Sequence, residues 1–373
     1  MEGVDGIHGP SKVLDDLPWK EEYRQIAWNA FVKNCTNNQV KTRFENNLVA
    51  GPNRESKFLV RIVGSPKPGE KMPLVIALHG GGSGPKEMND SQWQGMFNGY
   101  YKDAPEQAPY VYCALRAPND EWNGFYDDNI APLIESLKLA FVLYGNVDPN
   151  RVVITGASHG GYGTFVIATK MPHLFAAANA SASAPTDGET QGENLRNLYF
   201  TWVNGATDTA YGRADRVQAF DKQWHEWKSE HGGFNGGMTF LEGVGHSVPD
   251  RDKPAELLKH RRNPAPEKLI WNQTDDIVET HYYLVDPEPK SGRRIIVQQE
   301  KNVFTIVNSD AKKLLLYIPE SMSNEKITVI WGKTSTSYTL KPSSATFAKS
   351  FRVFLDPELA TPYSVEVNNP EFD

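Results

Sequence analysis

The feature of the sequence that most constrains the fold lies at residues 150–163, which read NRVVITGASHGGYG. A short apolar run at 152–155, typical of a buried strand, stops there, and a helical pattern begins at Tyr162. Between them, glycines surround one serine, Ser158. A strand that turns so sharply into a helix forces the central residue into a strained conformation, and its neighbours must be small. The stretch therefore predicts a strand–turn–helix unit that lifts a serine hydroxyl above the edge of a sheet.

Strand and helix patterns alternate on both sides of this unit. Continuous apolar runs are typical of strands buried on both faces, and apolar residues at helical spacing indicate helices. Such alternation predicts an α/β fold, a doubly wound and mostly parallel sheet with helices on both faces. Strands are predicted at 57–63, 74–78, 110–115, 152–155, 174–180, 198–203 and 238–241, and helices at 18–47, 130–144, 162–171 and 215–230.

The pattern changes after about residue 250. Residues 251–266 are charged and contain several prolines, as a linker does. From residue 267 onward, short alternating runs separated by turn residues predict an all-β domain, an Ig-like sandwich. We expect a helical extension (1–54) that packs on an α/β domain (55–262), followed by a β-sandwich accessory domain (267–373). The strands predicted in this last domain are 280–285, 294–299, 304–307, 314–318, 327–331, 337–340, 350–354 and 363–367.

A second glycine-rich loop, HGGGSG at 79–84, follows directly on a predicted buried strand. Backbone N–H groups in such a loop can bind the oxyanion that forms when a serine attacks a carbonyl. We predict Gly81 as one donor of this oxyanion hole, with Gly82 as the second choice. The N–H of His159, at the start of the helix after Ser158, is predicted as the other donor.

A serine nucleophile needs a base, and the base needs a carboxylate that orients it. His246 lies in a glycine-containing loop directly after a predicted strand, at the sheet edge where Ser158 also lies. Asp208 follows another strand at this edge. Its rival Asp215 falls in the first turn of a predicted helix, where a carboxylate favours the helix dipole, and Asp187 is a more distant alternative. The chain order Ser158, Asp208, His246 predicts the catalytic triad of a serine hydrolase.

Residues of about 55–250 resemble the α/β-hydrolase superfamily. They are most similar to the esterase branch that contains feruloyl esterases, acetylxylan esterases and polyhydroxyalkanoate depolymerases. Related chains are often labelled prolyl-oligopeptidase-like, and some carry a C-terminal β-module. The motifs that carry the resemblance are PLVIALHGGG at 73–82, VDPNRV at 147–152, GASHGG at 156–161 and GVGH at 243–246.

The sequence departs from this family at the acid loop. Relatives commonly have His-Gly-x-x-Asp followed by Val-Pro, whereas residues 204–211 here read NGATDTAY. Asp208 matches the pattern but its neighbours do not, which weakens the substrate assignment more than the triad. Candidate substrate contacts are aromatic residues that could stack on a sugar or phenolic ring, with core or lid packing as the alternative. They are Trp122, Tyr126, Tyr211 and Trp93.

We therefore expect a serine esterase that cleaves carboxylic esters, on carbohydrate-linked or aromatic acyl groups, without a cofactor. Other candidates are a prolyl-oligopeptidase-like peptidase, a polyester depolymerase and, from another class, a non-catalytic carbohydrate-binding protein. No Cys/His spacing indicates a metal site. A net charge of −7 without a basic stripe argues against nucleic acid as a partner. No run approaches the roughly 18 apolar residues of a membrane span.

The N-terminal residues lack the apolar core of a signal peptide. We expect a secreted or periplasmic protein whose signal peptide is not part of this sequence, with the cytoplasm as the alternative. Cys35 and Cys113 allow at most one disulfide, and the apolar surroundings of Cys113 favour a buried free thiol. The sequence leaves the oligomeric state open. It also leaves open whether the β-domain packs beside the catalytic domain or binds polysaccharide.

Overall fold

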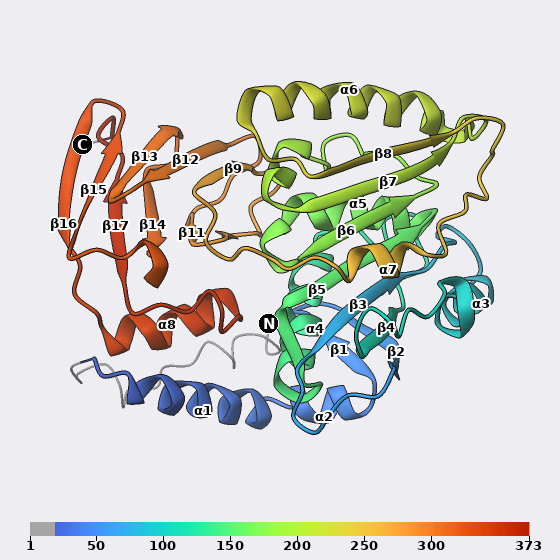
Figure 1. Cartoon of the computed structure of the whole chain (residues 1–373), viewed down its shortest axis with the longest axis horizontal. Helices are drawn as coiled ribbons and strands as arrows, with labels where there is room; N and C mark the ends of the chain where they lie inside the picture. Colours follow the sequence, from blue (N-terminus) through green and yellow to red (C-terminus); the bar gives the residue numbers. More distant parts are fainter. Residues whose placement is uncertain (1–18, 373) are drawn as a thin grey trace. The chain divides into compact units, whose positions relative to one another are not determined.

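The computed structural model describes residues 19–372 (Figure 1). Residues 1–18 of the predicted N-terminal extension, and Asp373, lie outside this range. The chain divides into two compact units. The larger unit comprises residues 41–262. Of the residues described, the smaller unit combines 19–40 with 263–372.

The larger unit alternates strands and helices along the chain, as its apolar patterns predict. Its elements are α2 (Val40–Glu45), β1 (Leu48–Ala50), β2 (Glu55–Val63), β3 (Met72–Leu78), α3 (Lys86–Gly95), η1 (Met96–Tyr100), β4 (Tyr110–Leu115), α4 (Ile130–Tyr144), β5 (Val147–Ala157), α5 (His159–Lys170), η2 (Pro172–Leu174), β6 (Ala177–Ser181), η3 (Gly192–Asn197), β7 (Tyr199–Gly205), η4 (Ala210–Gly212), α6 (Arg213–His231), β8 (Gly236–Leu241) and α7 (Lys253–Leu257).

These strands form one eight-stranded sheet in the order β1-β2-β4-β3-β5-β6-β7-β8 (Figure 1). The pairs from β4 to β8 are all parallel, whereas β1 and β2 add antiparallel strands at one edge. The mostly parallel sheet that the alternation predicts is therefore confirmed. Because parallel strands share a direction, the loops after β3, β5, β7 and β8 meet at one edge of the sheet.

Helices cover both faces of this sheet. On one face, Phe165 of α5 packs at 5.3 Å from Phe200 of β7 and 5.5 Å from Phe220 of α6, measured between ring centroids. On the other face, Val75 of β3 shares a buried cluster with Leu257 of α7. Every residue of β3 and β4 is buried, as their continuous apolar sequences predict.

The smaller unit contains two sheets whose buried residues form a common core. One sheet has the order β10-β11-β14-β17 and the other β16-β15-β13-β12-β9, in which β13 and β15 pair in parallel. The elements are α1 (Glu22–Asn37), β9 (Lys268–Asn272), β10 (Thr280–His281), β11 (Leu284–Val285), β12 (Arg294–Glu300), β13 (Val303–Asn308), β14 (Lys313–Tyr317), η5 (Glu320–Met322), β15 (Lys326–Trp331), β16 (Thr334–Thr339), α8 (Ser344–Phe354) and β17 (Ser364–Asn368).

The prediction of an all-β domain with a strand at 350–354 was wrong, because these residues end helix α8. The Ser343 hydroxyl caps this helix by accepting the Thr346 N–H at 3.2 Å. Phe347, Phe351 and Phe354 recur at helical spacing and are all buried. Five residues were too few to distinguish this spacing from strand alternation.

The N-terminal helix was also placed on the wrong unit. Helix α1 lies beside α8 (Figure 1), where Phe351 stacks on Phe31 at 5.7 Å and contacts Trp28 at 5.4 Å between ring centroids. The boundary therefore falls at residue 40 rather than 54. Beyond it, β1 joins the large sheet by pairing with β2.

Some shorter elements also differ from the sequence-based expectation. The strand predicted at 174–180 begins at Ala177, because Pro172 opens the short turn η2 before it. The expected linker at 251–266 contains helix α7, and helix α3 was not predicted. Cys35 and Cys113 are both buried free thiols. Within residues 19–372, no helix combines the length and apolar character needed to cross a bilayer.

The packing of α1 on α8 predicts the effect of Phe351→Ala. Removing this ring empties a buried aromatic site, so the unfolding free energy of the smaller unit should fall by about 3–5 kcal/mol. Chemical denaturation followed by tryptophan fluorescence measures the change. Lys349→Ala, an exposed position on the same helix, is the matched control and should change stability by less than about 0.5 kcal/mol. An equal effect of both variants would contradict this packing.

Candidate active site

Ser158 occupies the sharp turn between β5 and α5. Its backbone has φ 55° and ψ −120°, a conformation that non-glycine residues rarely adopt. The Ser158 N–H donates to the Ser181 carbonyl of β6 at 2.9 Å, which ties the turn to the neighbouring strand. The predicted strand–turn–helix unit is present, and it holds the serine at the sheet edge where the strands end.

Close backbone approaches explain the glycines around Ser158. A Cβ atom at Gly156 would lie 2.3 Å from the Gly160 carbonyl oxygen, and one at Gly160 would lie 2.1 Å from that of Leu78. Neither site accepts a side chain unless the backbone moves. The small residues therefore let α5 begin directly above β3 and β5.

His246 and Asp208 are brought to Ser158 from loops far along the chain. The His246 Nε2 atom lies 2.9 Å from Ser158 Oγ, and its Nδ1 atom lies 2.8 Å from Asp208 Oδ2. The Thr207 N–H and hydroxyl both donate to the Val244 carbonyl, at 3.0 and 2.8 Å, which joins the acid loop to the histidine loop. The three residues that the sequence predicts thus form one continuous hydrogen-bonded series.

Arg213, which sequence reasoning missed, holds Asp208 from the other side. Its Nε donates to Asp208 Oδ2 at 2.8 Å and its Nη2 to Oδ1 at 2.6 Å, and both side chains are buried. Burial alone would raise the pKa of Asp208, but the hydrogen bonds from Arg213 and His246 lower it below its ordinary value. The helix predicted from the sequence begins only at residue 215, whereas α6 begins at Arg213, so the sequence did not identify Arg213 as a partner of Asp208.

The rival residues lie elsewhere. Asp215 stands in the first turn of α6, and Asp187 pairs with Arg216 at 2.7 Å. The His159 side chain is buried, and its Nε2 donates to the Trp122 carbonyl at 2.8 Å. Burial lowers the pKa of His159 to about 4, so its ring is neutral near pH 7. The His159 imidazole therefore binds the loop after β4 through this hydrogen bond.

His79 sets the direction of the predicted oxyanion loop. Its Nε2 accepts the Ala117 N–H at 3.0 Å, so the ring proton is on Nδ1, which donates to the Gly80 carbonyl at 2.6 Å. Burial lowers the pKa of His79 to about 3 and keeps the ring neutral. In a trans peptide the C=O and the following N–H point in opposite directions. The Gly81 N–H therefore points away from His79.

Gly81 and Gly82 differ in the use of their N–H groups. No group within residues 19–372 accepts the Gly81 N–H, whereas the Gly82 N–H donates to Asn89 Oδ1 at 2.8 Å. The choice of Gly82 as an oxyanion donor was therefore wrong. His159 is the first residue of α5, where the helix leaves backbone N–H groups without an intrahelical acceptor. Gly81 and His159 remain as the candidate donors.

A cavity of about 760 Å³ opens beside Ser158 and His246. Its wall combines apolar side chains from η1 and the loop after β8 with polar ones from α3 and the same loop. Within the described part of the chain, no aromatic residue predicted to contact substrate lines this cavity. The residues that shape it include Met96, Tyr100, Val248, Ser91, Gln92 and Asp250.

The four predicted substrate contacts have other positions. Trp93 donates from Nε1 to the Ala114 carbonyl at 2.9 Å, and Tyr126 is buried. Trp122 lies with its ring centroid 5.7 Å from that of Tyr211, which is 72% exposed. The packing alternative holds for Trp93 and Tyr126. The sequence could not identify the residues that line the cavity, because part of its wall comes from α3 and η1, and neither helix was predicted.

No three His, Cys, Asp or Glu side chains within residues 19–372 are grouped so that they could hold a metal ion.

One protein-family model matches part of the chain. Residues 132–226, less than half of the chain, match the model of the prolyl oligopeptidase family. No curated protein sequence matches the chain. The match within residues 132–226 and the order of the mostly parallel sheet agree with an α/β-hydrolase-like fold.

Solved structures similar to the chain include esterases and a peptidase, each with a TM-score below 0.5. A thermostable esterase is 22% identical (TM-score 0.45), with 58% of this chain covering 64% of that one, less than two thirds of its length. An acetyl xylan esterase from Aspergillus awamori is 17% identical (TM-score 0.39), and the match covers 54% of this chain and 93% of that one. A putative dipeptidyl aminopeptidase IV from Bacteroides ovatus is 13% identical (TM-score 0.40), and the match covers 54% of this chain and 33% of that one. We draw nothing about substrate from these likenesses.

The buried pair of Arg213 and Asp208 predicts a pH-dependent effect of Arg213→Ala. The ionised form of Asp208, whose pKa is lowered on folding, contributes stability above its ordinary pKa of about 4. This contribution is lost as the pH falls through the lowered pKa. Arg213→Ala leaves a buried carboxylate without its cation, so the unfolding free energy at pH 7 should fall by about 3 kcal/mol. The gap from wild type should narrow below about pH 4.

Denaturant titrations at several pH values measure this gap. Arg216→Ala is the matched control, because Arg216 pairs with the highly exposed Asp187 and should contribute about 1 kcal/mol or less. A gap for Arg213→Ala that is independent of pH would show that the guanidinium does not act through Asp208.

Proposed function

We propose that the protein is a serine esterase that cleaves carboxylic esters through an acyl-enzyme. The observation that carries the proposal is the 2.9 Å contact between His246 Nε2 and Ser158 Oγ, at a strained turn beside an open cavity. A neutral imidazole at this distance can accept the hydroxyl proton as the oxygen attacks a carbonyl carbon.

In the proposed reaction, Ser158 Oγ bonds to the ester carbonyl carbon while His246 takes its proton. The N–H groups of Gly81 and His159 stabilise the oxyanion that forms. The intermediate collapses, the alcohol leaves with the proton from His246, and the acyl group stays on Ser158. A water molecule, deprotonated by His246, then attacks the acyl carbon, and the carboxylic acid leaves as Ser158 recovers its proton.

Asp208 and Arg213 prepare His246 for this cycle. The Asp208 carboxylate accepts the Nδ1–H of His246, which leaves Nε2 free to receive the serine proton. When His246 becomes charged, the carboxylate stabilises the imidazolium. Arg213 keeps Asp208 ionised in its buried position, and thus keeps the acceptor available.

For the substrate we propose an ester of a carbohydrate or an aromatic acyl group. The support is the cavity, which is large enough for a sugar or a phenolic ring and combines apolar and polar side chains. A polyester depolymerase uses the same chemistry on a longer chain. A non-catalytic carbohydrate-binding protein would not require the hydrogen-bonded series from Ser158 to Arg213.

A peptidase is the second candidate, because the matched family model is that of prolyl oligopeptidases. The same nucleophile and base can attack an amide, but the amine is a poorer leaving group than the alcohol of an ester. The two candidates therefore differ in substrate rather than in the residues at the site.

The first prediction from this proposal concerns Ser158→Ala. Loss of the nucleophile should lower kcat on p-nitrophenyl acetate by about 10⁴-fold or more, because no acyl-enzyme can form. Ser229→Ala, an exposed position on α6, is the matched control and should keep full activity. Full activity of Ser158→Ala would end the esterase proposal. Absence of any Ser158-dependent activity in the wild type would favour a binding protein.

A second prediction separates the two kinds of substrate. We expect kcat/KM on feruloyl, acetyl-xylan and short acyl esters to exceed that on aminoacyl-proline amides by at least about 100-fold, or 2.7 kcal/mol in transition-state free energy. Parallel assays with the same enzyme preparation measure the ratio. Equal or higher kcat/KM on the amides would favour the peptidase.

A further inference from the structure

Asn89, on helix α3, makes three hydrogen bonds beside the oxyanion loop. Its Oδ1 accepts the Gly82 N–H at 2.8 Å, and its Nδ2 donates to the Gly84 carbonyl at 3.3 Å and to Asp120 Oδ1 at 3.0 Å. The Asn89 side chain is only 1% exposed. One carboxamide thus joins the glycine loop after β3 to the loop after β4.

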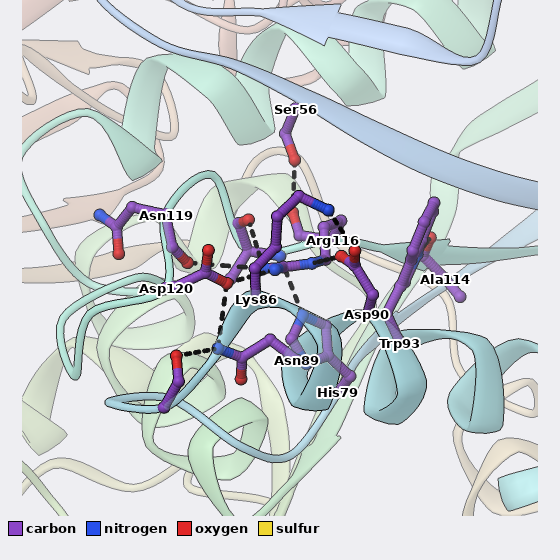
Figure 2. A network of polar contacts seen from close by, with 12 residues as sticks. Ser56, His79, Lys86, Asn89, Asp90, Trp93, Ala114, Arg116, Asn119 and Asp120 are labelled. Carbon is purple, nitrogen blue, oxygen red and sulfur yellow. Dashed lines mark hydrogen bonds and ion pairs between the residues drawn. The ribbon is translucent and has the colours of Figure 1, made fainter.

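A network of charged groups fixes Asn89 in turn (Figure 2). Arg116 donates from Nη2 to the same Asp120 oxygen that accepts from Asn89, and from Nε to Asp90 Oδ1 at 2.9 Å. The Arg116 side chain is 8% exposed, and its carbonyl accepts the Ser56 hydroxyl at 2.5 Å. Arg116 therefore holds the Asp120 carboxylate in the position in which it accepts the hydrogen bond from the Asn89 amide.

The glycine loop is confined between this carboxamide and a ring on its other side. A Cβ atom at Gly81 would lie 2.4 Å from Asn89 Oδ1, and one at Gly82 would lie 2.7 Å from Cδ2 of the His159 imidazole. Gly81 and Gly82 have φ values of 106° and 78°, which only glycine adopts readily. The backbone on either side of the Gly81 N–H is thus held at Gly80 by His79 and at Gly82 by Asn89.

We propose that Asn89, held by Arg116 and Asp120, is a positioning residue that keeps the Gly81 N–H directed at the oxyanion. The proposal rests on the esterase function above. Asn89 touches no reacting atom and acts through the loop. A preorganised donor stabilises the transition state without reorientation during the reaction, so loosening the loop lowers kcat more than it changes substrate binding.

A carboxamide satisfies all three of these neighbours, because it carries both an acceptor and a donor. The Gly82 N–H needs an acceptor, whereas the Asp120 carboxylate and the Gly84 carbonyl need a donor. Asn89→Asp keeps the shape and the acceptor, but it places a second carboxylate against Asp120. This like-charge contact pushes the two loops apart. Exchanging the two groups, as Asn89→Asp with Asp120→Asn, restores one acceptor and one donor at the same place.

The test measures kcat and KM on p-nitrophenyl acetate for Asn89→Asp, for the exchanged double variant and for Glu87→Gln, an exposed control on the same helix. We expect Asn89→Asp to lower kcat at pH 7 by about 10- to 100-fold, with KM within about twofold of wild type. The double variant should recover kcat to within about fivefold of wild type. Thermal unfolding of each variant shows whether it is folded.

Several results would overturn the proposal. They are an unchanged kcat in folded Asn89→Asp, a change in KM alone, or a folded double variant that recovers none of the lost kcat. If Asn89→Asp does not fold, the folded double variant decides, and a kcat more than about fivefold below that of wild type overturns the proposal. A wild type without Ser158-dependent hydrolysis would overturn the esterase function and this proposal together, whereas an active wild type beside a fully active Asn89→Asp overturns this proposal alone.

Discussion

The strained backbone of Ser158, with its positive φ, fixes the geometry of the whole site. A residue with φ 55° and ψ −120° persists only where its surroundings leave no relaxed alternative. Here β5 fixes the chain before it, the Ser181 carbonyl binds its N–H, and α5 begins where a side chain at Gly160 would overlap Leu78. The strain is thus maintained by the central strands of a buried sheet. It directs the hydroxyl toward the loops that follow β7 and β8.

The charged side chains lie on one side of the Ser158 hydroxyl, and the buried neutral histidines lie on the other. On one side, Arg213, Asp208 and His246 form a series in which a cation keeps the carboxylate ionised and the carboxylate orients the imidazole. On the other side, His79 and His159 are buried, and their lowered pKa values keep them neutral. They contribute hydrogen bonds and shape to the loops without adding charge. In the proposed reaction, one site therefore uses histidine both as a proton acceptor and as an uncharged support.

Much of this arrangement could be read from the sequence, because it depends on local rules and on chain direction. The glycines around Ser158 indicate the turn, and strand order places Asp208 and His246 at the same edge. The contacts that sequence reasoning missed depend on tertiary packing. Arg213 and Asn89 bind residues of neighbouring loops, and the spacing of residues along the sequence does not show that these loops come together. The Gly82 N–H binds the side chain of a residue seven positions away. Helix α8 was missed because the five residues 350–354 are too few to distinguish strand alternation from helical spacing.

We propose Ser158 as a nucleophile that His246 activates. Reaction with a fluorophosphonate probe, followed by mass spectrometry of the digested protein, tests it most directly, since such probes phosphonylate a serine only where a base and oxyanion donors activate it. We expect one adduct, on Ser158, and its loss in His246→Ala. An unlabelled protein, or an adduct on another serine, would contradict it.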